Sequence, residues 1–162
     1  MGKKKLPSYQ ELVKSYPFGE TADEVRHRIG GNVDHDWYEN TCVIRVSESL
    51  NEAKHPIPAD SGNFKTRRGA NKKWYGLGVQ QFWEYMERTY GKPDIHAERD
   101  PATGRIPYFD FFGNTGIIGF RVKGWNDASG HFTLFNGLFL MYGGADHDYW
   151  SISSKAALWK SG

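Results

Sequence analysis

The sequence predicts a mixed α+β fold, with helices in the N-terminal half and an antiparallel sheet in the C-terminal half. Before residue 91, the chain contains several segments in which apolar residues recur at helical spacing, and helix-capping patterns precede some of them. From residue 116 onward they follow the two-residue period of strands. The 19 glycines and the 15% content of aromatic residues are typical of sheets joined by tight turns. Helices followed by strands in one chain give the α+β arrangement.

Two short helices are expected before residue 40. Ser8 and Glu11 form a capping box at the start of the first, and Thr21 and Glu24 form one at the start of the second. Gly30 supplies the C-terminal stop of the second helix. Each helix carries an apolar face, so both are predicted to pack against a core.

A third helix is expected to begin at Cys42, the only cysteine in the chain. Its N-cap is either Asn40 or Thr41, because both side chains can accept a hydrogen bond from the first turn. The cysteine would then lie in the first turn of the helix. The apolar residues that share one face of this helix are Val43, Val46 and Leu50.

Residues 52–78 predict a long irregular connection, because they are rich in proline, glycine, lysine and arginine. A fourth helix is predicted over residues 79–90, where apolar side chains repeat at helical spacing before Gly91 ends the helix.

Two strands are predicted over residues 116–122 and 131–136. The pair Asn136-Gly137 indicates a two-residue hairpin turn into a third strand, "LFLMY". With that turn, Tyr142 would lie opposite His131. No repeat or convincing linker divides the chain, so a single domain over residues 1–162 is expected.

Charge and hydropathy limit the classes of function. The net charge of +2 and the isoelectric point near 8.6 are too small to indicate nucleic-acid binding. A single cysteine excludes a disulfide framework within the chain. No apolar run approaches the length of about 20 residues that spans a membrane, and the basic start lacks the apolar segment of a secretory signal. We therefore expect synthesis in the cytoplasm without a signal peptide, and no membrane association.

The position of Cys42 has two interpretations. A helix N-terminus or a nearby imidazole lowers the pKa of a thiol from about 8.5 and makes it a nucleophile. The same helix end offers a backbone N–H to an oxyanion, so the position suits acyl transfer. Alternatively, a lone cysteine is a small buried side chain with no chemical role.

A nucleophile of this kind needs a base, and His131 is the most suitable of the six histidines. It opens a predicted strand after the tight turn "WNDASG", and strand alternation places it on the face opposite Phe132 and Leu134. A cysteine on a helix that faces a histidine on a sheet is the arrangement of papain. The histidines expected to be solvated, on an exposed helix or in polar loops, are His27, His55 and His96.

The segments "YENTCVIRVSESLN", "FRVKGWNDASGHFTLFNG" and the closing "AALWKS" resemble the type VI secretion amidase effectors of family four, a branch of the papain-like cell-wall amidases related to NlpC-type peptidases. The resemblance covers most of the chain and implies a papain-like (NlpC-type) cysteine amidase fold. It implies an antibacterial toxin that cleaves peptidoglycan stem peptides between D-glutamate and meso-diaminopimelate in the periplasm of a target cell. The implied partners are a cognate immunity protein and the tube or spike of the type VI secretion machinery.

The resemblance assigns Cys42 as the nucleophile and His131 as the general base. In the family an aspartate shortly after the histidine orients the imidazole, and Asp146 is the preferred match. The alternatives for this third residue are Asp148 and Asp127. The residues expected to contact the substrate are Tyr38, Asn40 and Trp125. This chemistry requires no cofactor and no metal.

Other features permit other interpretations. The basic segment 63–75 could contact carboxylates of the stem peptide or nucleic acid, although a solvated loop is the simpler explanation. Segment 34–39 contains four possible metal ligands, Asp34, His35, Asp36 and Glu39. No second cluster in the sequence has a spacing suitable for metal ligands, so a required metal is not expected. Two other functions stay open: a non-catalytic module that binds an acidic polymer, and another papain-like acyl-transfer enzyme such as a protein deamidase or transglutaminase.

Overall fold

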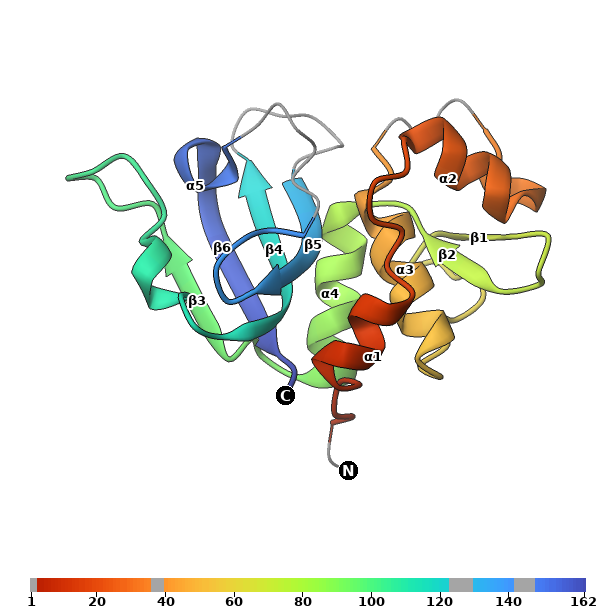
Figure 1. The fold of residues 1–162 in the computed structure, drawn as a ribbon, viewed down its shortest axis with the longest axis horizontal. Coiled ribbons are helices and arrows are strands. Elements are labelled where there is room, and N and C mark those ends of the chain that lie inside the picture. Colours follow the sequence, from red (N-terminus) through yellow and green to blue (C-terminus); the bar gives the residue numbers. More distant parts are fainter. Residues whose placement is uncertain (1–2, 36–39, 123–129, 142–147) are drawn as a thin grey trace.

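The structure, a computed structural model, describes residues 3–35, 40–122, 130–141 and 148–162. A four-stranded antiparallel sheet lies on one side of the molecule, and helices α1 to α4 lie on the other (Figure 1). The predicted α+β class is confirmed. The helical elements are α1 (Tyr9–Lys14), α2 (Ala22–Ile29), η1 (Gly31–Val33), α3 (Cys42–Glu52), α4 (Val79–Tyr90), η2 (Tyr108–Asp110) and α5 (Tyr149–Ile152). The strands are β1 (Thr66–Arg68), β2 (Trp74–Gly76), β3 (Ile95–Glu98), β4 (Thr115–Val122), β5 (Gly130–Asn136) and β6 (Ser153–Lys160).

The predicted helix starts are confirmed. The Ser8 side chain accepts a hydrogen bond from the Glu11 backbone N–H at 3.2 Å at the start of α1. At the start of α2, Thr21 and Glu24 form both bonds of a capping box. Helix α4 ends at Gly91, whose φ of 93° few other residues adopt without strain.

The large sheet has the strand order β3-β6-β4-β5, and all its neighbouring strands are antiparallel. Strand β5 is therefore an edge strand, and α3 packs against it. In β5, His131 lies opposite Phe120 of β4. This arrangement brings the start of α3 to the edge strand that carries His131.

Both faces of the sheet are buried, in two separate apolar clusters. On one face, α4 packs its aromatic residues against the sheet, with Phe82 edge-on to Phe132 at 4.8 Å and Trp83 edge-on to Trp159 at 5.7 Å between ring centroids. On the other face, η2 and α5 cover Phe120 and other residues of the sheet. The predicted alternation along β5 is confirmed, because Phe132 and Leu134 belong to the first cluster and Phe135 belongs to the second.

The segment 52–78 is not the irregular connection that its composition predicts. It contains a short antiparallel hairpin, in which β1 pairs with β2 and Arg67 lies opposite Tyr75. Lys72 takes a positive φ of 68° in the turn, where glycine or asparagine is more usual. Helix α3 contacts the hairpin directly, since Ser47 Oγ accepts a hydrogen bond from the Gly76 N–H at 3.0 Å. Tertiary contacts therefore override a composition that is typical of loops.

The predicted two-residue turn at Asn136-Gly137 is wrong. Phe135 pairs with Leu140 in an isolated bridge, two residues beyond the predicted partner, and no strand begins at Leu138. The Asn136 side chain explains the difference, because its Oδ1 accepts hydrogen bonds from the N–H groups of residues 138 and 139 at 2.8 and 2.7 Å. The turn is displaced by one residue, because the Asn136 N–H donates to the Phe139 carbonyl oxygen at 3.1 Å and Gly137 and Leu138 therefore form the turn.

Strands β3 and β6 are absent from the sequence-based prediction. Four consecutive residues of β6, from Ala156 to Trp159, are buried, so a central strand shows no alternation of polar and apolar residues. His96 lies in β3 rather than in a polar loop, although its side chain is exposed as expected. Among the described residues, no helix combines the length and apolar character needed to cross a membrane.

Candidate active site

The start of α3 is organised by Asn40 rather than by the residue at its N-cap position. Thr41 occupies that position without making a side-chain cap, whereas Asn40 Oδ1 accepts a hydrogen bond from the Cys42 N–H at 3.1 Å. Asn40 Nδ2 also donates to the Gly130 carbonyl oxygen at 3.4 Å. A single side chain therefore links the first turn of the helix to the first residue of β5.

The Cys42 thiol is buried against the edge of the sheet, with only 3% of the residue exposed. Its sulfur accepts a hydrogen bond from the backbone N–H of Phe132, the residue after His131. Burial raises the pKa of Cys42 to about 11, while the N–H groups of Phe132 and Val43 and the charge of Arg45 act in the opposite direction. The expectation that the helix N-terminus lowers the pKa of Cys42 is therefore wrong for this geometry. The free-energy cost of desolvating the thiolate is larger than the stabilisation that the hydrogen bonds and the charge of Arg45 provide.

Arg45 lies one turn further along α3, and only 2% of the residue is exposed. Its Nε donates to Thr41 Oγ1 at 3.0 Å, and a terminal nitrogen donates to the Pro17 carbonyl oxygen at 2.9 Å. These bonds tie the first turn of α3 to the connection between α1 and α2. The sequence pattern gave no indication of this role, since an arginine in an apolar helix usually projects into solvent.

His131 is also buried, with 5% of the residue exposed. Its imidazole ring lies flat against the ring of Tyr149, with ring centroids 4.2 Å apart and an angle of 2° between the planes. Burial raises the pKa of Tyr149 to about 12, and the charge of Cys42 acts in the same direction. The structure thus brings together Cys42, His131 and Tyr149, the last of which sequence reasoning missed.

The other predicted site residues divide into two groups. Asp148 caps α5 by accepting a hydrogen bond from the Trp150 N–H at 3.1 Å, and its carboxylate pairs with Arg105 at 3.0 Å on the surface. The remaining predicted residues lie outside the described part of the chain; they are Tyr38, Trp125, Asp127 and Asp146.

The charged segments away from this site have partners of their own. In the segment 63–75, Arg67 pairs with Asp60 at 3.6 Å and Lys73 pairs with Glu52. In the acidic segment, Asp34 pairs with His27 at 3.1 Å. Within the described ranges, no three His, Cys, Asp or Glu side chains gather as a possible metal site.

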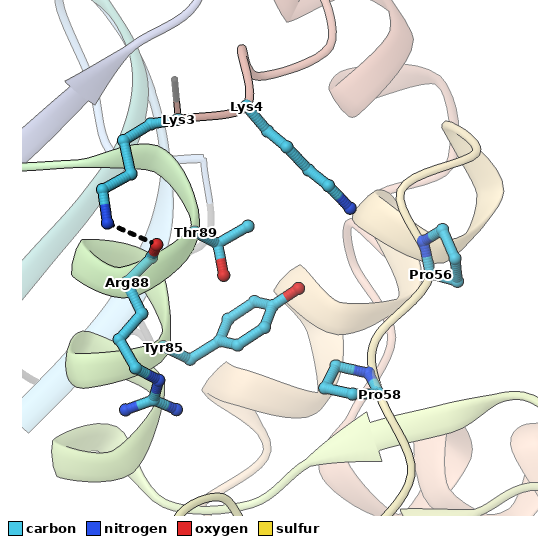
Figure 2. Close-up of a pocket in the computed structure, with 7 residues that line it drawn as sticks. All are labelled: Lys3, Lys4, Pro56, Pro58, Tyr85, Arg88 and Thr89. Atoms are coloured by element: carbon cyan, nitrogen blue, oxygen red, sulfur yellow. Dashed lines mark hydrogen bonds between the residues drawn. The ribbon is translucent and has the colours of Figure 1, made fainter. Parts of the chain in front are cut away.

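A separate open hollow of about 470 Å³ lies near the other end of α3, where the N-terminal segment crosses the end of α4. Figure 2 shows Lys3 reaching the end of α4, where its Nζ donates to the Arg88 carbonyl oxygen at 2.8 Å. The predicted site residues that the structure describes, Asn40, Cys42, His131 and Asp148, do not line this hollow. Its lining residues are Lys3, Lys4, Pro56, Pro58, Tyr85, Arg88 and Thr89.

Comparison with known proteins identifies the family of the chain. Residues 38–159 match the family of type VI secretion system amidase effector protein 4 (Tae4). The chain belongs to this family. The family is one of amidases, so the predicted function of an antibacterial peptidoglycan amidase effector is confirmed at this level. No match was found among curated proteins.

Solved structures of Tae4 proteins share the fold over the whole chain. The Tae4–Tai4 effector–immunity complex from Salmonella Typhimurium has a TM-score of 0.81 and 29% sequence identity, and the match covers 96% of this chain and 99% of that one. The equivalent complex from Enterobacter cloacae has a TM-score of 0.81 at 27% identity, covering 96% and 99%. The Enterobacter cloacae effector alone has a TM-score of 0.80 at 28% identity and covers both chains completely.

Proposed function

We propose that this Tae4-family protein hydrolyses the peptide bond between D-glutamate and meso-diaminopimelate in peptidoglycan stems through a thioester on Cys42. His131 serves as the base, and Asp146 orients its imidazole. The observation that carries the proposal is the burial of the Cys42 thiol against the Phe132 N–H, next to a histidine whose ring is held flat. In this proposal, residues 1–162 act as one catalytic domain.

The raised pKa of Cys42 determines the order of events. At neutral pH the thiol is protonated, so His131 removes the proton as the sulfur attacks the amide carbonyl. The new C–S bond gives a tetrahedral oxyanion, and its collapse breaks the C–N bond while His131 returns the proton to the leaving amine. His131 then removes a proton from water, which attacks the thioester and regenerates the thiol.

Asn40 controls the donor nearest to the oxyanion. The Cys42 N–H donates to Asn40 Oδ1 at 3.1 Å. A substrate oxyanion at the helix end competes with that side chain for the same N–H, and the Asn40 Nδ2 provides a second donor close by. Asn40 is therefore a substrate-binding residue in this proposal, and Tyr38 and Trp125 complete the cleft.

The biological setting follows from the family and from its solved complexes. The Salmonella and Enterobacter effectors were solved with Tai4 immunity proteins. We propose that this chain likewise has a cognate immunity protein, and that the tube or spike of the secretion machinery carries it. It is made in the cytoplasm of the producing cell and acts in the periplasm of the target.

Digestion of purified diaminopimelate-type peptidoglycan tests the proposal. The wild-type protein should release fragments with a new D-glutamate carboxyl terminus and a new diaminopimelate amine, identified by mass spectrometry. Cys42→Ala should release none while its circular dichroism spectrum stays unchanged. Intact stems with the folded wild-type protein, or full activity in Cys42→Ala, would overturn the proposal.

A further inference from the structure

We propose that Tyr149 is the positioning residue of His131, holding the plane of the imidazole so that one nitrogen faces the Cys42 thiol. This inference rests on the proposed function, because it takes His131 as the base. It adds a residue of α5, which is separated in sequence from both the cysteine and the histidine blocks.

The geometry of the ring pair is specific. The two rings are parallel within 2° and 4.2 Å apart between centroids. Two other ring pairs in the same cluster meet edge-on, since Phe120 and Tyr108 lie against Trp150 at 87° and 85°. The imidazole of a histidine can rotate over a broad range about the terminal side-chain torsion. The Tyr149 ring, which lies flat against one face of the His131 imidazole, restricts this rotation. Since His131 and Tyr149 are each only 5% exposed, water does not substitute for this contact.

Tyr149 is itself held in place from two directions. Its ring stacks on Phe120 at 5.6 Å, and Phe120 is the partner of His131 in the neighbouring strand. Asp148 caps the short helix that carries Tyr149, and the pair with Arg105 anchors that cap. The candidate acid Asp148 therefore acts on the site through the helix that it caps.

An aromatic face also favours the protonated form of the histidine. During the proposed reaction His131 becomes an imidazolium after it takes the thiol proton. A cation over an aromatic face is attracted to the negative charge of that face, and the attraction is stronger when the pair is removed from water. The tyrosine ring thus both orients the base and stabilises the charge that the base acquires.

Two variants separate the ring from the hydroxyl. Tyr149→Phe keeps the stacked ring, and we expect kcat on a soluble stem peptide to stay within about 5-fold of wild type. Tyr149→Leu removes the ring, and we expect kcat to fall about 10²-fold with KM little changed, because the base is displaced rather than the substrate site. Tyr149→Met, which fills more of the space, should behave like the leucine variant if the latter does not fold.

Tyr85→Leu is the matched control. Tyr85 is a buried tyrosine that stacks on Phe64 at 4.9 Å in the cluster on the other face of the sheet. Its loss should reduce stability while kcat stays close to wild type below the unfolding transition. A kcat loss in this control as large as in Tyr149→Leu would overturn the assignment, since general destabilisation would then explain both variants.

The chemical shifts of the His131 ring protons give a readout that does not depend on activity. In the wild type these protons should be shifted upfield by the tyrosine ring, and the shift should persist in Tyr149→Phe and disappear in Tyr149→Leu. An unshifted resonance in the wild type, or an unchanged kcat in folded Tyr149→Leu, overturns the inference. Full activity in Cys42→Ala would instead reject the thioester mechanism, while the ring-proton shifts would still test the position of Tyr149.

Discussion

At the scale of single residues, the candidate site depends on side chains that bridge different elements. Asn40 illustrates this, because its amide contacts both the Cys42 N–H on α3 and the Gly130 carbonyl oxygen on β5. The sequence indicated Asn40 as a helix cap or a substrate contact, and its position in the structure is compatible with both. Its removal should therefore affect catalysis more than stability.

We expect Asn40→Ala to lower kcat/KM for a stem peptide about 10-fold or more, because the helix start and β5 lose their polar link and the oxyanion loses a donor. The free energy of unfolding should fall by only about 1 kcal/mol, the usual cost of losing a helix cap. Asn114→Ala is the matched control, since the Asn114 side chain donates to the nearby carbonyl oxygens of Phe111 and Phe112. Equal kcat/KM values for the two variants would contradict the role of Asn40.

The third catalytic residue is a second question at this scale. We expect Asp146→Asn to lower kcat by about 10²-fold or more, because an asparagine orients the imidazole without stabilising its charge. Asp148→Asn should keep the cap of α5 and lose only the exposed pair with Arg105, so its kcat should stay within about 3-fold of wild type. Steady-state kinetics on one soluble stem peptide compares the two variants. The reverse ranking would make Asp148 the third residue.

At the scale of elements, the close approach of β4 and β5 places the histidine. Gly130 precedes His131, and a Cβ atom there would lie 2.0 Å from the Phe120 carbonyl oxygen and 3.0 Å from Val79 Cγ1. The two strands can pair beside His131 only because this position has no side chain. The glycine before the histidine is thus part of the geometry of the site.

Gly130→Ala should therefore lower the free energy of unfolding by about 2 kcal/mol or more, because the strands must separate to admit the methyl group. Urea unfolding followed by circular dichroism measures this change. Gly62→Ala is the control, since no heavy atom lies within 4 Å of an added Cβ there, and its stability should change by less than about 0.5 kcal/mol. Similar midpoints for both variants would show that the strands adjust at little cost.

Elements with local sequence rules were predictable, and elements that depend on distant partners were not. Helices α2 and α4 follow from a capping box and from apolar spacing, which are properties of adjacent residues. The hairpin β1–β2 bonds to Ser47 of α3, and β3 and β6 pair with strands far away in the chain or with each other across a long separation. The turn after β5 was predicted one residue too early, because the Asn136 side chain accepts hydrogen bonds from the N–H groups of Leu138 and Phe139 and shifts the turn to Gly137 and Leu138.

At the scale of the whole molecule, α3 connects the other helices and the β1–β2 hairpin to the edge of the large sheet. Val43 and Leu50 belong to the core shared with α4 and the sheet, whereas Ile44 belongs to the cluster under α2. Arg28 of α2 reaches Glu48 of α3 through two hydrogen bonds of 2.7 Å. Burial on all sides explains why the thiol at the start of this helix is protected from water.

The sequence could indicate only those parts of the site that do not depend on the burial of residues in the folded core. A cysteine at a helix start and a histidine on a strand are local patterns, and the structure brings them together as expected. The Tyr149 stack depends on α5 folding back over β4, and the raised pKa of Cys42 depends on desolvation by the complete core. Neither property is encoded in any short stretch of residues.

Burial of Cys42 also predicts how stability changes at alkaline pH. Folding raises the pKa of Cys42 from 9.0 to about 11, so between these values the unfolded chain loses the thiol proton while the folded protein keeps it. The free energy of unfolding should therefore fall as pH rises through this range, by up to about 2 to 3 kcal/mol. The half-buried Tyr9 and the buried Tyr149, whose pKa values are raised to about 12, add a further loss above about pH 10.

Cys42→Ala isolates the thiol contribution, because alanine does not ionise. At pH 7 the variant should be less stable than wild type by about 1 kcal/mol, owing to the small cavity left by the sulfur. At pH 10, one unit above the pKa of the thiol in the unfolded chain, the free energy of unfolding of the wild type should be about 1.4 kcal/mol lower than at pH 7. The wild type and the variant should then be nearly equal in stability. Urea unfolding at pH 7, 9 and 10 measures the difference. A constant difference across this range would mean that the thiol has the same pKa in the folded and unfolded states, and hence that Cys42 is not desolvated as the structure indicates.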